Sequence, residues 1–117
     1  MNTILIIDDN QYIRFTLTVV VEEYGYRAIT AESCEEGIKE IMMNKPSLII
    51  LDKKLPDGDG IDLLKTIRKL GNIPVIMLTA YANEISSVEA MRHGAFALFT
   101  KPFNNDEMIS TIKKALP

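Results

Sequence analysis

The amino-acid sequence predicts an α/β fold, in which a doubly wound five-stranded parallel sheet carries helices on both faces. Short apolar runs rich in Ile, Leu and Val alternate about five times with longer amphipathic stretches. This alternation is typical of a parallel sheet that is covered by helices on both sides. The chain has 117 residues, within the usual size of one domain, so residues 1–117 are predicted to form a single domain.

The predicted strands are the short apolar runs. They lie near residues 3–7, 27–30, 48–51, 74–78 and 95–99. The run at 48–51 is continuously apolar, as expected for a central parallel strand that is buried on both faces. Asp52 follows this strand directly and is therefore expected at its carboxyl end.

Five helices are predicted between and after these strands, the fourth near residues 84–92. Ser33 and Glu36 have the spacing of a capping box at the start of the second helix, and Gly25 and Gly94 end the first and fourth. The apolar positions that repeat at helical spacing are predicted to face the core. These are Ile13, Leu17, Val20 and Tyr24; Ile38, Ile41 and Met42; Ile61, Leu64 and Ile67; Ile85, Val88 and Met91; and Met108, Ile109, Ile112 and Leu116.

Composition and charge argue against several classes of protein. Hydrophobic residues make up 47% and charged residues 25%, close to the globular average, so neither a disordered nor a fibrous chain is indicated. The apolar runs are far shorter than the roughly 18 residues of a membrane span, and the N-terminus lacks the regions of a signal peptide, so a cytoplasmic location is expected. The single cysteine, Cys34, forms no internal disulfide. A net charge of −3 and a pI near 5.1 disfavour direct nucleic-acid binding.

Polar side chains follow four of the predicted strands. Asp8 and Asp9 come after the first strand, Asp52 after the third, Thr79 after the fourth and Lys101 just past the fifth. Ligands of an open parallel sheet bind beyond the carboxyl ends of the strands, where the strand order reverses. These side chains are therefore expected to converge on one pocket.

The residue types at these positions favour phosphoryl chemistry. Three carboxylates in one crevice repel one another, and a divalent cation removes that cost. An all-oxygen site that also receives phosphate suits Mg²⁺. Lys101 and Thr79 would supply a positive charge and a hydroxyl donor to the phosphoryl oxygens. Asp52 is then the nucleophile, because a carboxylate can carry an acyl phosphate.

Each of these residues also has a simple structural interpretation. Asp9 or Asn10 fits a cap of the first helix, Thr79 fits a cap of a later helix, Asp52 fits a turn, and Lys101 fits a solvated loop. Their joint occurrence at successive strand ends favours the pocket over these separate interpretations.

The motifs in this order closely resemble the receiver domains of two-component signalling systems, over essentially the whole chain. The resemblance is carried by Asp8-Asp9, by Asp52 with Pro56 and Gly60 downstream, by Thr79-Ala80 and by Lys101-Pro102-Phe103. It implies the flavodoxin-like (CheY-like) fold, with strand order 2-1-3-4-5.

The resemblance also implies roles for individual residues. Asp52 would be the phospho-acceptor, Lys101 the phosphate-binding lysine and Thr79 the switch hydroxyl. The bound Mg²⁺ would be held directly by Asp9, largely through water by Asp8, and also by Asp52 and the backbone carbonyl of Lys54.

One position departs from the family pattern. Many receivers carry an aromatic switch residue three positions before the lysine, whereas this chain has Leu98 there. Phe96 and Phe99 are nearby, but they are predicted to face the other side of the strand and to pack in the core.

The resemblance implies a signalling phospho-acceptor rather than an enzyme. Its partners would be a sensor histidine kinase or a histidine phosphotransfer protein, which would transfer a phosphoryl group to Asp52. The surface made by the helix near 84–92, the strand near 95–99 and the final helix would then change and contact an output domain or a second copy. Residues 89–96 are similar to receivers attached to enhancer-binding transcription activators, which indicates transcriptional regulation. A stand-alone receiver and a receiver from a longer regulator both remain open.

Two other functions compete with this interpretation. A Mg²⁺-dependent aspartyl-phosphate phosphatase would use the same pocket on external phosphate esters. Such enzymes commonly carry a second aspartate two residues after the nucleophile, and Lys54 at that position counts against this alternative. A pseudo-receiver that serves only as an interaction domain is disfavoured by the complete acceptor set.

Overall fold

The computed structural model describes residues 2–81 and 85–117. A parallel five-stranded sheet has the order β2-β1-β3-β6-β7, and a separate two-stranded antiparallel hairpin is formed by β4 and β5. The sheet strands are β1 (Thr3–Ile7), β2 (Arg27–Ala31), β3 (Leu48–Asp52), β6 (Val75–Thr79) and β7 (Ala97–Thr100), and the hairpin strands are β4 (Lys54–Leu55) and β5 (Gly58–Asp59). Because β6 and β7 are the fourth and fifth strands of the main sheet, the predicted strand order is confirmed.

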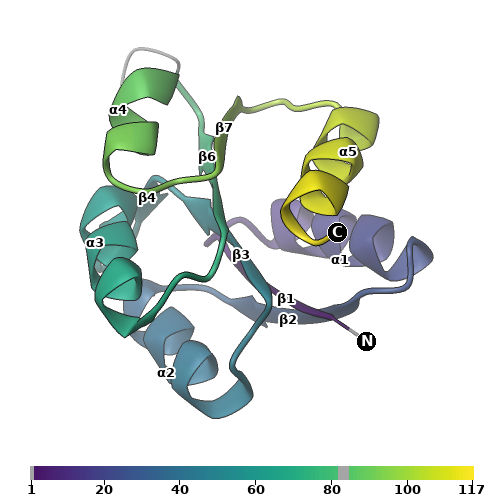
Figure 1. Ribbon diagram of the computed structural model, residues 1–117, viewed down its shortest axis with the longest axis horizontal. Coiled ribbons are helices and arrows are strands. Elements are labelled where there is room, and N and C mark those ends of the chain that lie inside the picture. The colour runs from purple at the N-terminus through teal and green to yellow at the C-terminus, as the bar shows by residue number, and fades with distance from the viewer. Residues whose placement is uncertain (1, 82–84) are drawn as a thin grey trace.

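Helices cover both faces of this sheet, as predicted (Figure 1). They are α1 (Gln11–Glu23), α2 (Cys34–Asn44), α3 (Gly60–Leu70), α4 (Ser87–Arg92) and α5 (Asn105–Ala115). Helices α1 and α5 lie on one face, while α2, α3 and α4 lie on the other. None of the described helices has both the length and the apolar character needed to cross a membrane.

The hydrophobic core consists of two clusters separated by the sheet. In β3, Ile49 and Leu51 face the cluster under α2 and α3, whereas Leu48 and Ile50 face the cluster under α1 and α5. All five residues of β3 are buried. The continuous apolar run predicted for a central strand is therefore confirmed, and it places Asp52 at the middle of the sheet edge.

Side-chain caps fix where several helices begin. Asn10 accepts hydrogen bonds from the backbone N–H groups of Tyr12 and Ile13, so it is Asn10, of the two candidate residues, that caps α1. The Ser33 hydroxyl accepts from the Glu36 N–H, as the capping-box pattern predicted. Gly25 follows α1 with a φ of +86°, a conformation that favours glycine.

The predicted core face is wrong at the edge of α2. Met42 is 61% exposed, while Gly37 and Ile41 make the buried face of this helix. A Cβ atom on Gly37 would lie 2.7 Å from Ile7 Cδ1, so glycine lets α2 approach β1 closely at this point. The contact then runs along Gly37 and Ile41, and Met42 points to solvent. Tyr24, at the end of α1, is likewise exposed.

The fourth helix also differs from its prediction. It begins at Ser87, and its buried residue is Ala90, whereas Val88 is 63% exposed and Met91 is also exposed. Ile85 is buried but precedes the helix. The helix is short and packs through a small side chain, which leaves the larger apolar residues outside. The predicted start at Glu84 lies outside the described residues.

Candidate functional site

The acidic residues at the strand ends converge, as the sequence predicted. Asp8 and Asp9 follow β1, and Asp52 ends the adjacent strand β3. One carboxylate oxygen from each of the three residues lies within 4.8 Å of the others. Asp8 and Asp52 are buried, whereas Asp9 is exposed at the mouth. The group has the ligand type and spacing needed to bind a metal ion.

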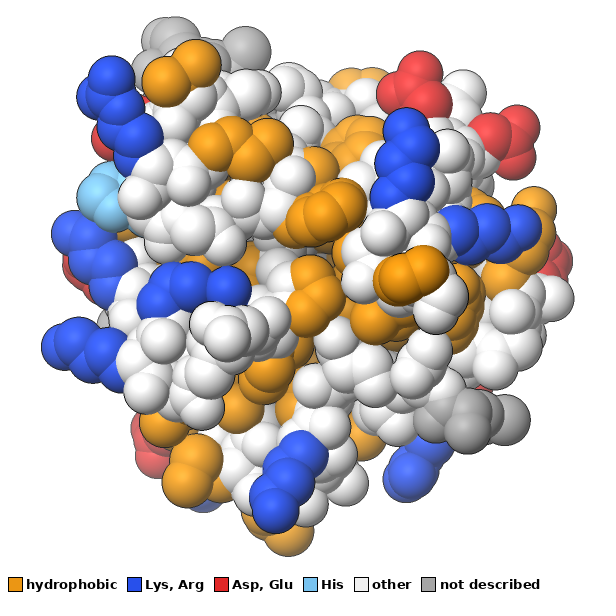
Figure 2. Space-filling view, in the orientation of Figure 1, with side chains coloured by type: hydrophobic (Ala, Val, Ile, Leu, Met, Phe, Trp, Pro, Cys, Tyr) orange, Lys and Arg blue, Asp and Glu red, His pale blue; other side chains and the backbone are white. Residues whose placement is uncertain are grey.

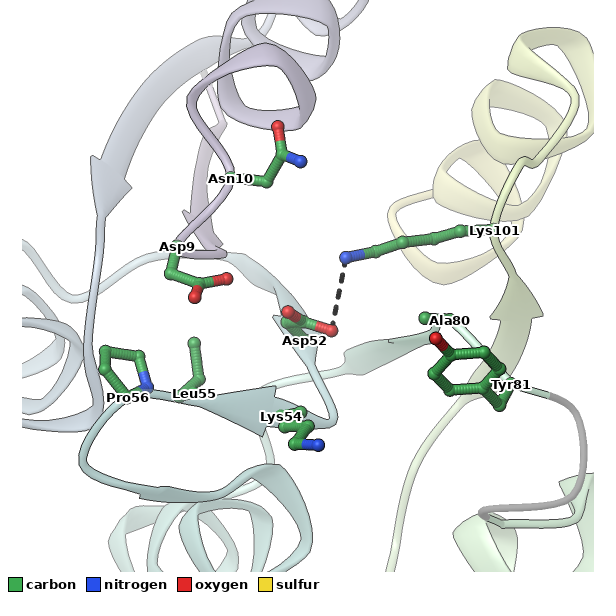
Figure 3. A pocket seen from close by; sticks show the side chains of 9 residues that line it. All are labelled: Asp9, Asn10, Asp52, Lys54, Leu55, Pro56, Ala80, Tyr81 and Lys101. Atoms are coloured by element: carbon green, nitrogen blue, oxygen red, sulfur yellow. Dashed lines mark ion pairs between the residues drawn. The ribbon is translucent and has the colours of Figure 1, made fainter.

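Asp9 and Asp52 border a pocket of about 340 Å³ (Figure 3). The side chains of Asp9, Asp52 and Lys101 point into the same space, and Lys101 reaches it from the loop after β7. The residues that line the pocket are Asp9, Asn10, Asp52, Lys54, Leu55, Pro56, Ala80, Tyr81 and Lys101.

Lys101 forms ion pairs with two of the carboxylates. Its Nζ atom lies 2.8 Å from Asp8 Oδ2 and 3.3 Å from Asp52 Oδ1. Burial alone would lower the pKa of Lys101, but the hydrogen bonds and charges of the two carboxylates raise it above its usual range. Lys101 therefore stays charged, and it partly neutralises the acidic group.

The two oxygens of the Asp8 carboxylate have different partners. Its Oδ1 atom accepts from the Asn10 N–H at 2.9 Å. Its Oδ2 atom accepts no well-aligned hydrogen bond within the described part of the chain, although it lies at ion-pair distance from Lys101. Such an incompletely satisfied buried carboxylate fits the chemistry of a cation site.

Burial and the charge of Asp8 raise the pKa of Asp52 from 3.8 to about 6. Lys101 and a hydrogen bond from the Lys54 backbone offset part of this rise. At neutral pH the Asp52 carboxylate is therefore ionised but more basic than an ordinary aspartate. This state suits a nucleophile, because it is charged and only partly solvated.

Contacts of Gly60 and Asp59 fix the shape of the loop after Asp52. Gly60 approaches the Asp52 carbonyl so closely that any Cβ atom would collide with it. Asp59 caps α3 by accepting from the Ile61 N–H and also pairs with Lys53 Nζ at 2.8 Å. The hairpin base beside the pocket is therefore tightly fixed.

Three predicted site residues lie around the pocket in different ways. Lys54 lines it, and its backbone donates a hydrogen bond to Asp52. Thr79 is buried next to it, and its hydroxyl donates to the Tyr81 carbonyl at 3.1 Å. Leu98 is not among the lining residues and packs with the core on the α2–α3 side.

Of the two aromatic residues near Leu98 that were predicted to pack in the core, Phe99 does so and Phe96 does not. Phe99 packs in the opposite cluster from Leu98, as predicted, and contacts the Phe103 ring edge-on. Phe96 precedes β7 and is exposed, so its prediction as a core residue is wrong. The strand begins two residues later than predicted, and the alternation of faces therefore does not extend back to Phe96.

The sequence reading missed two contributors to the site. Tyr81 lines the pocket two residues after Thr79. The sequence signal for it was weak, because it was one aromatic residue in a predicted loop. Arg14 on α1 donates to the Asp8 carbonyl at 2.8 Å. No sequence pattern pointed to that contact.

Comparisons with known proteins agree with this geometry. Residues 4–113 match the family model for the response regulator receiver domain. The KDP operon transcriptional regulatory protein KdpE of Escherichia coli is 39% identical over 116 residues, which cover 99% of this chain and 52% of that protein. The sporulation initiation phosphotransferase F of Bacillus subtilis is 37% identical over 115 residues, covering 97% of this chain and 93% of that protein. The chain thus spans about half the length of the transcriptional regulators it matches.

Solved structures show the same relationship. A two-component response regulator from Clostridium difficile superposes with a TM-score of 0.94 at 34% identity, covering 99% of this chain and 96% of that one. A CheY-like receiver domain protein from Methanospirillum hungatei gives a TM-score of 0.92 at 34% identity, covering 99% and 94%. Sequence and fold agree, and the chain belongs to the response regulator receiver domain family.

Proposed function

We propose that the protein accepts a phosphoryl group on Asp52 with the help of bound Mg²⁺. The convergence of Asp8, Asp9 and Asp52 around one pocket, with Lys101 within ion-pair distance, is the observation that carries this proposal. The all-oxygen donor set fits Mg²⁺, which keeps several waters and takes few protein ligands. Asp8, Asp9, Asp52 and the Lys54 carbonyl would hold the ion, and when bound it would neutralise charge on the phosphoryl oxygens.

The residues of the pocket divide the work of transfer. An Asp52 carboxylate oxygen attacks the phosphorus of a phosphohistidine donor. The new bond is O–P, the bond that breaks is P–N, and the histidine nitrogen keeps its electron pair. The Lys101 ammonium group exchanges its ion pair with the Asp52 carboxylate for one with a phosphoryl oxygen. The Thr79 hydroxyl donates a hydrogen bond to another phosphoryl oxygen.

The donor is proposed to be a sensor histidine kinase or a histidine phosphotransfer protein. Such a donor must bring its histidine to the mouth of the pocket, beside the start of α1. There Tyr12 and Phe15 are large, exposed side chains that line a neighbouring hollow with Gln11. An apolar rim of this kind supports docking of a protein partner rather than reaction with a free small molecule alone.

The signal is proposed to leave through the surface made by α4, β7 and α5, which serves an output domain or a second copy of the chain. Val88, Met91 and Phe96 are exposed apolar residues of α4 and of the segment before β7. Figure 2 shows exposed hydrophobic side chains in the region between the α4 and α5 parts of the molecule. Regulation of transcription would then be the task of an attached domain, and this domain itself would not bind nucleic acid.

A phosphatase that hydrolyses external phosphate esters is not favoured. Lys54 occupies the position two residues after Asp52 and offers no carboxyl group as general acid. A phospho-acceptor that hydrolyses only its own acyl phosphate agrees better with this pocket. The cytoplasmic location and the single domain over residues 1–117 stay predictions.

Intact-mass spectrometry after treatment with acetyl phosphate and Mg²⁺ tests the proposal. The wild type should gain one phosphoryl group, and removal of Mg²⁺ with a chelator should abolish the gain. Asp52→Ala should gain none, whereas Asp106→Ala, which changes an exposed aspartate of α5, should behave as the wild type. Undiminished phosphate uptake by Asp52→Ala would disprove the assignment of Asp52.

A further inference from the structure

Residues 32–35, called the 32–35 turn below, comprise the bend after β2 and the first two residues of α2. They are linked through side chains to two segments that carry proposed metal ligands. One of these is the loop after β1, which holds Asp8 and Asp9. The other is the β4–β5 hairpin, which begins at Lys54. Different residues make the two contacts, so each can be tested separately.

Arg14 joins the 32–35 turn to the first loop. Its Nη1 atom donates to the Asp8 carbonyl at 2.8 Å, and its Nη2 atom donates to Glu32 Oε1 at 2.9 Å. The Arg14 side chain is largely buried. The Asp8 N–H also donates to the Ala31 carbonyl at 3.1 Å. The Asp8 N–H is therefore held by the end of β2, and the Asp8 carbonyl is held by Arg14, which also pairs with Glu32.

Asp57 joins the 32–35 turn to the hairpin. Its two carboxylate oxygens accept from the Cys34 N–H at 2.8 Å and from the Glu35 N–H at 3.0 Å. These N–H groups belong to the first turn of α2 and have no acceptor within the helix, and the next one, on Glu36, is bound by Ser33. A carboxylate is well suited to this place, because it meets the positive end of the helix dipole. The tip of the hairpin is thus fixed to the start of α2.

We infer that the 32–35 turn is a shared brace that positions both metal-binding loops and thereby sets the Mg²⁺ affinity of the pocket. This inference rests on the proposed function. Arg14 and Asp57 act through the loops and not on the ion itself, so both are positioning residues. Loss of either contact should let the ligands of one loop spread apart, and groups that orient metal ligands typically contribute about 10-fold or more to affinity.

Charge and positioning predict opposite results for Arg14. Replacement of a cation near an acidic pocket should by charge alone tighten Mg²⁺ binding. Loss of the brace should weaken it. We therefore expect Arg14→Met to bind Mg²⁺ about 10-fold more weakly than the wild type, and Arg14→Lys, which keeps the charge and one donor, to fall between them.

For Asp57 charge and positioning act in the same direction, so a matched control is needed. Asp57 and Asp62 are exposed carboxylates that line the same hollow beside Cys34. Within the described residues, the Asp62 side chain makes no hydrogen bond or ion pair. Asp57→Ala should weaken Mg²⁺ binding clearly more than Asp62→Ala. Amide hydrogen exchange at Cys34 and Glu35 should quicken only in Asp57→Ala.

The experiment measures Mg²⁺ affinity by NMR titration of the purified chain, with urea unfolding as a check on the fold. Weaker binding in both Arg14→Met and Asp57→Ala, beyond Asp62→Ala, supports the shared brace. Unchanged or tighter binding in Arg14→Met, or equal binding in Asp57→Ala and Asp62→Ala, overturns it. If Arg14→Met does not fold, Arg14→Lys takes its place, and binding equal to that of the wild type overturns the brace. If the wild type itself binds no Mg²⁺, the proposed function fails, and the brace fails with it.

Discussion

Lys101 Nζ lies 2.8 Å from Asp8 Oδ2, although the Asp8 side chain is completely buried. A buried carboxylate is costly without a partner, and the lysine, whose side chain is 17% exposed, provides one from the loop after β7. The same nitrogen reaches Asp52. One cation therefore holds together carboxylates from two strands before any phosphoryl group arrives.

Lys101→Met should destabilise the metal-free protein at neutral pH by about 2 kcal/mol, because it leaves two buried carboxylates without their partner. The loss should shrink in mildly acidic solution, where Asp52, with a pKa of about 6, takes up a proton. Urea unfolding would measure it, with Lys69→Met, at an exposed lysine of α3, as the control. Phosphorylation or its consequence should also weaken. A loss no greater than that of the control, together with normal phosphorylation and activation, would contradict the role of Lys101.

Asp52→Asn should stabilise the metal-free protein at pH 7.5. The folded chain binds the Asp52 proton more tightly than the unfolded chain, because the pKa rises from 3.8 to about 6 on folding. Stability therefore falls as the pH rises through this window, and the asparagine variant avoids the loss. The gain should be about 1–2 kcal/mol, after a discount for solvent around the carboxylate.

The difference between Asp52→Asn and the wild type should diminish as the pH is lowered from 7.5 toward 4. Urea unfolding at several pH values would follow it, with Asp62→Asn as an exposed control. Saturating Mg²⁺ should reverse the order, because it stabilises only the chain that binds it. A variant that is less stable than the metal-free wild type at pH 7.5 would contradict the raised pKa.

Mg²⁺ should bind more weakly as the solution becomes acidic. The ion and a proton compete for the Asp52 carboxylate, and its pKa, near 6, brings this competition into the mildly acidic range. Affinity should therefore decline steeply below pH 6 and change little between pH 7.5 and 8.5. Titration at several pH values would measure it. Flat affinity from mildly alkaline to mildly acidic solution would contradict a shared site at Asp8, Asp9 and Asp52.

The sequence was sufficient for the sheet and for the site at its edge, for a physical reason. The strands are short runs buried on both faces, and parallel strands bring their carboxyl ends to one edge. Asp8, Asp9, Asp52 and Lys101 could thus be brought together by counting strands. Their roles in phosphoryl transfer remain predictions.

Other features depend on contacts that no local pattern encodes. The hairpin strands have two residues each, too few to show a period. The Asp57 carboxylate binds the Cys34 N–H although the two residues are 23 positions apart in the chain. Arg14 donates to the Asp8 carbonyl only because the loop between β1 and α1 bends back toward it. The buried face of α2 was misassigned at Met42 because Gly37, and not a large apolar residue, makes the closest approach to the sheet.

Binding of beryllofluoride, a phosphoryl mimic, should shift amide signals of the α4–β7–α5 surface as well as those of the pocket. The Thr79 hydroxyl now donates to the Tyr81 carbonyl. If it turns to a phosphoryl oxygen, the loop that leads to α4 must rearrange, which biases a two-state equilibrium of this surface. Leu98 has no aromatic ring to follow the hydroxyl inward, so the loop after Thr79 should carry most of the change.

The matched variant is Thr79→Ala, which should still bind beryllofluoride at Asp52 but should confine the shifts to the pocket loops. NMR spectra of both proteins with Mg²⁺, with and without the mimic, would measure the spread. Shifts that reach α4 and β7 only in the wild type would indicate that a second copy or an attached domain reads this surface. If the wild-type shifts also stay within the pocket loops, the switch through Thr79 is wrong. The protein would then act chiefly as a phosphoryl carrier whose partners dock at the pocket itself.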